Sequence, residues 1–139
     1  MGKQKMFVYL ISHDRKDIKT HTYIGASGNF QKRLLQHNCE APGGPRITRR
    51  AAGRWSPVMI LELPGEREYS AKDVKKKWKQ SSRGLESRIR KGFELAQQYD
   101  VNVYISKEDK LKVVQELEWD EDGTLQLGEK EWNKLMYGD

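Results

Sequence analysis

The chain has 139 residues, a length that suits one domain, or one domain with a small appendage, and that is enough to bury a core. Four Trp, six Tyr and three Phe residues argue against global disorder, and a single cysteine excludes an intramolecular disulfide framework and a multi-cysteine zinc module. The net charge of +6 is unevenly spread, because residues 1–100 carry 21 basic and 10 acidic side chains, whereas residues 101–139 carry 5 basic and 10 acidic ones. The basic part favours a polyanionic partner, first nucleic acid and second an anionic membrane.

The first two apolar segments predict a β-hairpin. Residues 6–12 form a short β-branched and aromatic run that is too brief for a buried helix, and residues 22–26 form a second one. Antiparallel pairing about the middle of the loop between them places Tyr9 opposite Gly25. Tyr9 and Tyr23 are then diagonal neighbours on one face of the sheet, a relation that a slip of one residue would destroy.

The next segment predicts a short helix over residues 30–37, after a turn-like cluster of Ser, Gly and Asn. Phe30 and Leu34 lie four residues apart on the side that we expect to be buried. Arg33 and His37 have the same spacing, so they lie one turn apart on a neighbouring face. Such a pair, taken alone, is usually part of a solvated face.

Basic segments alternate with predicted elements in the middle of the chain. An arginine-rich stretch at residues 46–55 precedes an apolar run at 56–63 that suits a third strand. A lysine-rich helix begins at Ser70 with a capping-box pattern, and a longer amphipathic helix runs over residues 83–99. Glu86 lies at the edge of the apolar stripe of that longer helix, so we expect it to be half-buried.

The C-terminal section is acidic. Residues 101–105 suit a short strand, residues 106–117 an amphipathic helix, and residues 129–137 a terminal helical piece. Because the charge changes sign where this section begins, we predict a main domain over residues 1–100. The acidic extension over residues 101–139 is then packed on that domain or appended to it.

Taken together, these elements resemble the signature of the GIY-YIG nuclease family. The first motif contains Tyr9, and the second begins fourteen residues later at Tyr23 and ends at Gly25. Arg33 stands eight residues after that glycine, and Glu86 follows on a later helix. The resemblance covers about two thirds of the chain, and four elements in this order and spacing are a specific signal.

The resemblance implies an α+β fold with a small, mostly antiparallel three-stranded sheet flanked by helices. It also implies an endonuclease that hydrolyses phosphodiester bonds in DNA and that uses one divalent ion per active site, Mg²⁺ or Mn²⁺. The expected catalytic residues are Tyr9, Tyr23, Arg33, His37 and Glu86, with Glu86 as the metal ligand.

The chemistry of these side chains agrees with such a role. A single carboxylate can hold Mg²⁺ when waters and a phosphate fill the other positions. Arg33 can grip phosphate oxygens in a bidentate fork. The sequence leaves open which of Tyr9, Tyr23 and His37 is the general base, because a phenol titrates near about 10 unless a neighbour lowers its pKa. Some family members carry a lysine directly after the glycine of the second motif, where this chain has Ala26, and that gives His37 more weight.

A finer similarity concerns the residues after the first predicted helix. Gly43, Gly44 and the arginine-rich run that ends at Trp55 are similar to the catalytic half of a eukaryotic endonuclease subunit that cuts DNA flaps and Holliday junctions. The zinc module of that relative is absent here, where Cys39 is the single cysteine. We therefore expect branched or flapped DNA as the substrate, in repair or recombination. A sequence-specific restriction or mobile-element endonuclease and a non-catalytic nucleic-acid-binding module remain as alternatives.

Two basic segments are the candidate DNA contacts. Their basic residues interleave with Trp55 and Trp78, which favours phosphate contacts over a merely solvated face. We expect these residues to border the same cleft as Glu86, whereas His13 and His21 are expected at the surface. The candidates are Arg46, Arg49, Arg50, Arg54, Lys75, Lys76 and Lys79.

The sequence also predicts the compartment. Low cysteine content favours a reducing, intracellular environment, either cytoplasm or nucleus. No apolar run approaches the roughly 18 residues of a membrane helix, and the N-terminus lacks the apolar stretch of a signal peptide. We expect a protein that is not secreted and does not contact membranes, with DNA as its partner. Protein partners and the oligomeric state are left open.

Overall fold

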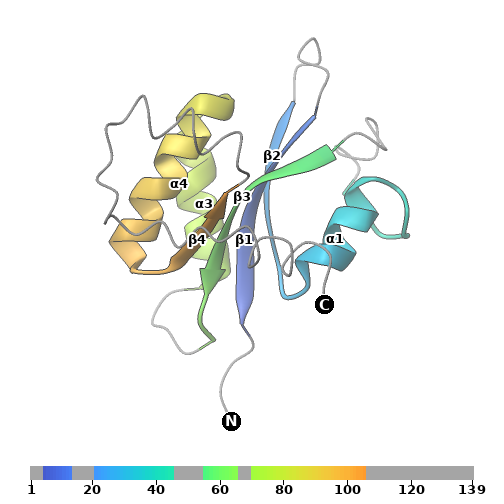
Figure 1. The fold of residues 1–139 in the computed structure, drawn as a ribbon, viewed down its shortest axis with the longest axis horizontal. Helices are drawn as coiled ribbons and strands as arrows, with labels where there is room; N and C mark the ends of the chain where they lie inside the picture. The colour runs from blue at the N-terminus through green and yellow to red at the C-terminus, as the bar shows by residue number, and fades with distance from the viewer. Residues whose placement is uncertain (1–4, 14–20, 46–54, 66–69, 106–139) are drawn as a thin grey trace.

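The computed structural model describes residues 5–13, 21–45, 55–65 and 70–105, which form one antiparallel sheet with helices on both faces (Figure 1). The strand order is β2-β1-β3-β4. Helix α1 lies against one face, and α3 and α4 lie against the other (Figure 1). The α+β prediction is therefore confirmed. The elements are β1 (Met6–His13), β2 (Thr22–Ser27), α1 (Phe30–His37), β3 (Trp55–Leu63), α3 (Ala71–Gln80), α4 (Leu85–Tyr99) and β4 (Asn102–Ile105).

The β1–β2 hairpin has the register that the sequence predicts. Tyr9 pairs with Gly25, and Ile11 pairs with Tyr23. Since side chains alternate between the faces of a strand, Tyr9 and Tyr23 share one face. Val8 and its alternating neighbours point to the other face, where they join the larger apolar core.

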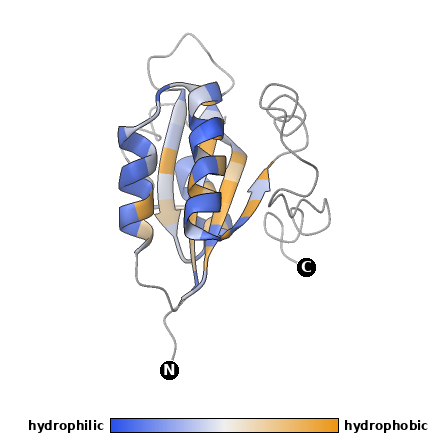
Figure 2. Cartoon of the chain, turned by 90° about the vertical axis from the view of Figure 1, so that its left-hand side faces the viewer, coloured by the Kyte–Doolittle hydropathy of each residue, from blue (hydrophilic) through white to orange (hydrophobic). Residues whose placement is uncertain are grey.

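The larger core lies between the sheet and the two helices α3 and α4. Trp78 of α3 and Phe93 of α4 are at most 1% exposed and pack with Leu10 of β1. A Cβ atom on Gly92 would stand 2.8 Å from Cζ2 of Trp78, so a glycine lets α4 approach α3 and the sheet closely. Figure 2 shows the result: both helices turn hydrophilic faces outward, and the apolar residues of the strands lie behind them.

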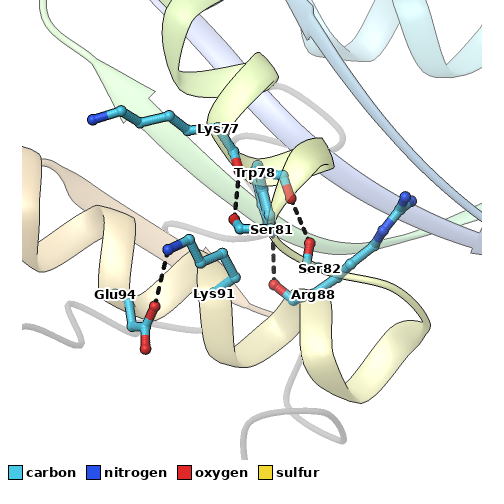
Figure 3. Close-up of polar contacts among 7 residues, drawn as sticks. All are labelled: Lys77, Trp78, Ser81, Ser82, Arg88, Lys91 and Glu94. Atoms are coloured by element: carbon cyan, nitrogen blue, oxygen red, sulfur yellow. Dashed lines mark hydrogen bonds and ion pairs between the residues drawn. The ribbon is translucent and has the colours of Figure 1, made fainter.

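Hydrogen bonds to backbone oxygens fix the connection between α3 and α4 (Figure 3). Trp78 donates its Nε1–H to the carbonyl oxygen of Arg88 at 2.7 Å, so the buried indole keeps no unsatisfied donor. Ser82 donates to the carbonyl oxygen of Trp78, and Ser81 donates to that of Lys77 at 2.6 Å. At its other end α3 begins with the predicted capping box between Ser70 and its third helical residue.

Within the described residues the sheet has four strands, whereas the sequence predicted three. Asn102–Ile105 pairs with β3, for example Tyr104 with Ile60, and Val103 and Ile105 turn their side chains into the larger core. This pairing joins residues 40 positions apart or more, so local patterns do not reveal it. The predicted helices at 106–117 and 129–137 lie outside the described residues, and the domain boundary at residue 100 stays a prediction.

Candidate active site

Helix α1 brings its C-terminal turn onto the face of the sheet that carries the two tyrosines. Asn29 caps the helix, with its Oδ1 accepting a hydrogen bond from the backbone N–H of Lys32 at 3.1 Å. Phe30 is buried against Tyr9, with 4.9 Å between the ring centroids. With its start fixed in this way, the helix directs His37 at the sheet, and His37 has no exposed surface.

Tyr9, Tyr23 and His37 form a compact aromatic cluster. The Tyr9 Oη and His37 Nε2 atoms are 2.6 Å apart, a short hydrogen bond between two fully buried side chains. The Tyr23 and His37 rings lie 5.0 Å apart, and Tyr23 stays half-buried. Gly25 makes this packing possible, because a Cβ atom there would stand 2.6 Å from Cζ of Tyr9 and 3.0 Å from Cε1 of Tyr23. The structure thus brings together the three candidates for proton transfer.

Arg33 borders this cluster, and hydrogen bonds to its own helix and to the following loop hold its side chain. Its Nη1 donates to Oε1 of Gln36 at 2.7 Å and to the carbonyl oxygen of Gly43 at 3.2 Å. Gln36 in turn donates from Nε2 to the carbonyl oxygen of Pro42 at 3.0 Å. A hollow of about 440 Å³ lies next to this loop and is lined by residues 39–43. The half-buried guanidinium therefore stands between the aromatic cluster and an open surface.

Burial determines the protonation states of the cluster. It raises the pKa of Tyr9 and, to a smaller extent, that of Tyr23, and the neighbouring Arg33 guanidinium opposes both shifts. Burial and, secondarily, the charge of Arg33 lower the pKa of His37 to about 4. At neutral pH the two phenols and the imidazole are uncharged. Arg33 then supplies the positive charge among these four side chains.

A pair of hydrogen bonds ties the end of α1 to the start of β3. Asn38 donates from Nδ2 to the carbonyl oxygen of Trp55 at 3.1 Å and accepts from the backbone N–H of Trp55 at 2.9 Å. The amide side chain thus pairs with the strand as another strand would. Trp55 is buried, and the ring of His13 packs edge-on against it at 5.3 Å.

His13 is therefore not the surface residue that the sequence predicted. The strand β1 continues to residue 13, and alternation places His13 on the same face as Tyr9, where it is 1% exposed. The expectation for Glu86 was also wrong. Glu86 is exposed rather than half-buried, because it lies on the first turn of α4 and the buried positions of that helix begin only at Ile89.

The remaining predicted site residues belong to other helices or lie outside the described residues. Glu86 and the α3 lysines belong to helices on the opposite face of the sheet from α1 (Figure 1). Lys75 is half-buried, and Lys76 and Lys79 are exposed. The structure does not describe Arg46, Arg49, Arg50 and Arg54. Their grouping with Glu86 around one cleft stays a prediction.

Sequence reasoning missed Gln36, Asn38 and Gly43. Gln36 lies three residues after Arg33, a helical spacing at which two side chains can meet, so its contact with Arg33 had a detectable signal. Gly43 has a φ of +102°, which glycine adopts readily, but its carbonyl contact with Arg33 depends on the path of the loop. The pairing of Asn38 with Trp55 has no local signal.

Comparison with known proteins identifies one family. Residues 5–83, more than half of the chain, match the GIY-YIG catalytic domain. The matched stretch includes both tyrosines of the cluster, Arg33 and His37, and it ends three residues before Glu86. No curated protein matches the chain. Among the described helices, none is long and apolar enough to span a bilayer.

Proposed function

Because the chain belongs to the GIY-YIG catalytic domain family, we propose that it is an endonuclease that hydrolyses phosphodiester bonds in branched or flapped DNA. Membership of the family indicates a nuclease-type enzyme, and the choice of substrate is our proposal. The observation that carries the proposed nuclease activity is the Tyr9–His37 hydrogen bond of 2.6 Å beside Arg33. This arrangement puts proton-transfer groups and a fixed positive charge in one place, as phosphoryl chemistry requires.

Arg33 supplies charge stabilisation. Gln36 and Gly43 both accept hydrogen bonds from one nitrogen of its guanidinium, which fixes the plane of the group. A guanidinium fixed in this way can donate to the non-bridging oxygens of a phosphate and stabilise the charge that develops on them. Because Arg33 is half-buried rather than covered, a phosphate can reach it from the solvent side.

His37 is the proton acceptor in our proposal. With a pKa of about 4 it is unprotonated at neutral pH, whereas Tyr9 and Tyr23 keep their protons because burial raises their pKa values. Its partner across the short hydrogen bond is Tyr9. Tyr9 and His37 have no exposed surface, so Tyr23 is the member of the aromatic cluster that can meet an incoming water. Cleavage rates of variants of all three side chains test this assignment.

Nucleases of this family generally depend on a divalent metal, and we propose Glu86 as its ligand. The aromatic cluster and Arg33 contribute no carboxylate, and no group of three or more His, Cys, Asp and Glu side chains converges within the described residues. In this proposal Glu86 provides the one carboxylate, and waters and the substrate phosphate complete the shell of the ion, as Mg²⁺ accepts. A bound Mg²⁺ or Mn²⁺ supplies a Lewis acid for the phosphate and lowers the pKa of a bound water.

The connections at both ends of residues 46–54 support the proposed DNA contacts. The preceding loop contacts Arg33 through Gly43, and the following residue, Trp55, pairs with Asn38 next to His37. The four arginines of this stretch are therefore joined to the chain beside the candidate site at both ends. The α3 lysines are a second candidate contact, on the other face of the sheet.

Cleavage of a labelled DNA panel tests the proposed function. The panel contains linear duplexes, flaps, forks and four-way junctions, with Mg²⁺ or Mn²⁺ supplied. We expect cleavage of branched substrates, and a rate loss of about 10²–10³-fold in Arg33→Ala, since removing one charge-stabilising donor has an effect of this size. We expect comparable losses in Tyr9→Phe and Glu86→Ala.

The control is Lys91→Ala, which removes a positive charge on α4 that pairs with Glu94. We expect this variant to cut at the wild-type rate. Cleavage of linear duplexes at fixed sequences would favour the restriction or mobile-element alternative. Binding of DNA without turnover under all metal conditions would favour the non-catalytic module. A Glu86→Ala variant that cuts as well as the wild type would remove Glu86 from the mechanism.

A further inference from the structure

The amide of Gln36 sits between Arg33 and the loop that follows α1. Its Oε1 accepts from Nη1 of Arg33 at 2.7 Å, and its Nε2 donates to the carbonyl oxygen of Pro42 at 3.0 Å. The two contacts determine the orientation of the amide. If the amide were flipped, two donors would face each other at Arg33 and two acceptors at Pro42.

Gly43 completes this arrangement. Its carbonyl oxygen accepts a second hydrogen bond from the same nitrogen of Arg33, at 3.2 Å. Its φ of +102° is one that other residues rarely adopt. A Cβ atom on Gly43 would stand 3.1 Å from Nε2 of Gln36, so a larger residue would press on the amide. Gln36 and Gly43 therefore hold the guanidinium from two sides, and neither adds a charge that would neutralise it.

We propose that Gln36 is a positioning residue for the nuclease reaction, which acts by holding the Arg33 guanidinium in the orientation that a phosphate transition state needs. The inference rests on the proposed function. An unrestrained arginine samples many rotamers, and ordering it during the reaction has an entropic cost. A guanidinium that is oriented in advance avoids that cost at the moment of reaction. Gln36 thus influences the rate through Arg33, without touching the reacting atoms.

The first test replaces Gln36 by methionine, which keeps the length of the side chain and removes both hydrogen bonds. We expect kcat to fall by about 10–100-fold, the range that misplacement of a catalytic group produces, and KM to change by less than about 3-fold. Gln98→Met is the matched control, because it makes the same change at an exposed position of α4. We expect it to keep the wild-type kcat.

A double-mutant cycle separates positioning from folding. In an Arg33→Ala background, Gln36→Met should cause no further loss of kcat, because the group that it orients is already absent. Gly43→Ala should reproduce the loss of Gln36→Met by displacing the amide. A further loss of about 10-fold or more in the Arg33→Ala background, or an unchanged kcat in Gln36→Met, would overturn the inference.

A spectroscopic measurement tests the inference without any nuclease activity. In the wild-type chain, the hydrogen-bonded Nη1 of Arg33 should show slowed guanidinium rotation and therefore separate Nη resonances in NMR spectra at low temperature. In Gln36→Met these resonances should merge, while the backbone spectrum stays that of the folded protein. Separate resonances in Gln36→Met would contradict the inference. If the wild-type chain cuts no DNA, the proposed function fails, and this measurement still decides whether Gln36 orients Arg33.

Discussion

The two faces of the sheet are built differently. The face under α3 and α4 packs large apolar side chains such as Leu10, Trp78 and Phe93. The face under α1 buries a phenol and an imidazole that bond to each other, Tyr9 and His37. Burying polar groups contributes less to stability than burying hydrocarbon, even when they are hydrogen-bonded. One face therefore mainly stabilises the domain, while the other gives part of its buried volume to the side chains that we propose as catalytic.

The largest effect should come from the apolar face. Phe93→Ala removes a 1% exposed ring from the larger core and should lower the free energy of unfolding by about 4 kcal/mol. Chemical denaturation measures this loss. The rate per folded molecule should stay at the wild-type level, because the ring lies across the sheet from Tyr9 and His37. A selective loss of rate in fully folded Phe93→Ala would break the division between the two faces.

Acid should act on the face under α1. The unfolded chain protonates His37 near pH 6.5, whereas the folded chain does so near its lowered pKa of about 4. Between these values the unfolded state binds more protons, so stability that is fully present above pH 6.5 is lost as the pH falls toward 4. The loss attributable to His37 approaches about 3 kcal/mol at the acid end.

Urea denaturation at a series of pH values measures this dependence. The control is His37→Gln, which keeps a polar group at the position and does not titrate in this interval. We expect its free energy of unfolding to depend much less on pH between 6.5 and 4. Equal pH dependence in wild type and variant would mean that the protonation of His37 is not linked to folding.

The smallest of these effects on stability should come from Gly25→Ala. The added Cβ would stand 2.6 Å from Cζ of Tyr9, so the phenol must move and the free energy of unfolding should fall by about 2 kcal/mol. Because Tyr9 also bonds to His37, the nuclease rate should fall as well. Gly84→Ala is a useful comparison, since nothing lies within 4 Å of a Cβ atom there and only its φ of +79° opposes the change. If Gly84→Ala lowered the rate per folded molecule as much as Gly25→Ala does, the effect would not arise at Tyr9.

Sequence patterns within single segments predicted the part of the candidate site that is formed by elements adjacent in the sequence. Antiparallel pairing about the middle of the loop predicted the pairing of Tyr9 with Gly25, and the four-residue spacing in a short helix placed Arg33 and His37 together. The full burial of His37 did not follow from spacing, because it depends on the angle at which α1 meets the sheet.

Contacts between distant segments were not predictable from the sequence. The fourth strand pairs Tyr104 with Ile60, and the support of Arg33 by Gly43 depends on the turn that the loop takes after α1. The exposure of Glu86 depends on which side of α4 packs against the core. These features are determined by tertiary packing, and the hydrophobic periodicity of a single segment does not predict them.

The hydrogen-bonded pair of Asn38 and Trp55 has a consequence for the segment that lies between them in the sequence. The pair fixes the end of α1 to the start of β3. Loop-closure entropy grows only slowly with length, by about 0.6 kcal/mol for each doubling. The segment at 46–54 can therefore be lengthened, shortened or exchanged for that of a relative at small cost to folding. Because Asn38 holds α1 against β3, the residues of the candidate site can be retained in evolution while the segment at 46–54 changes.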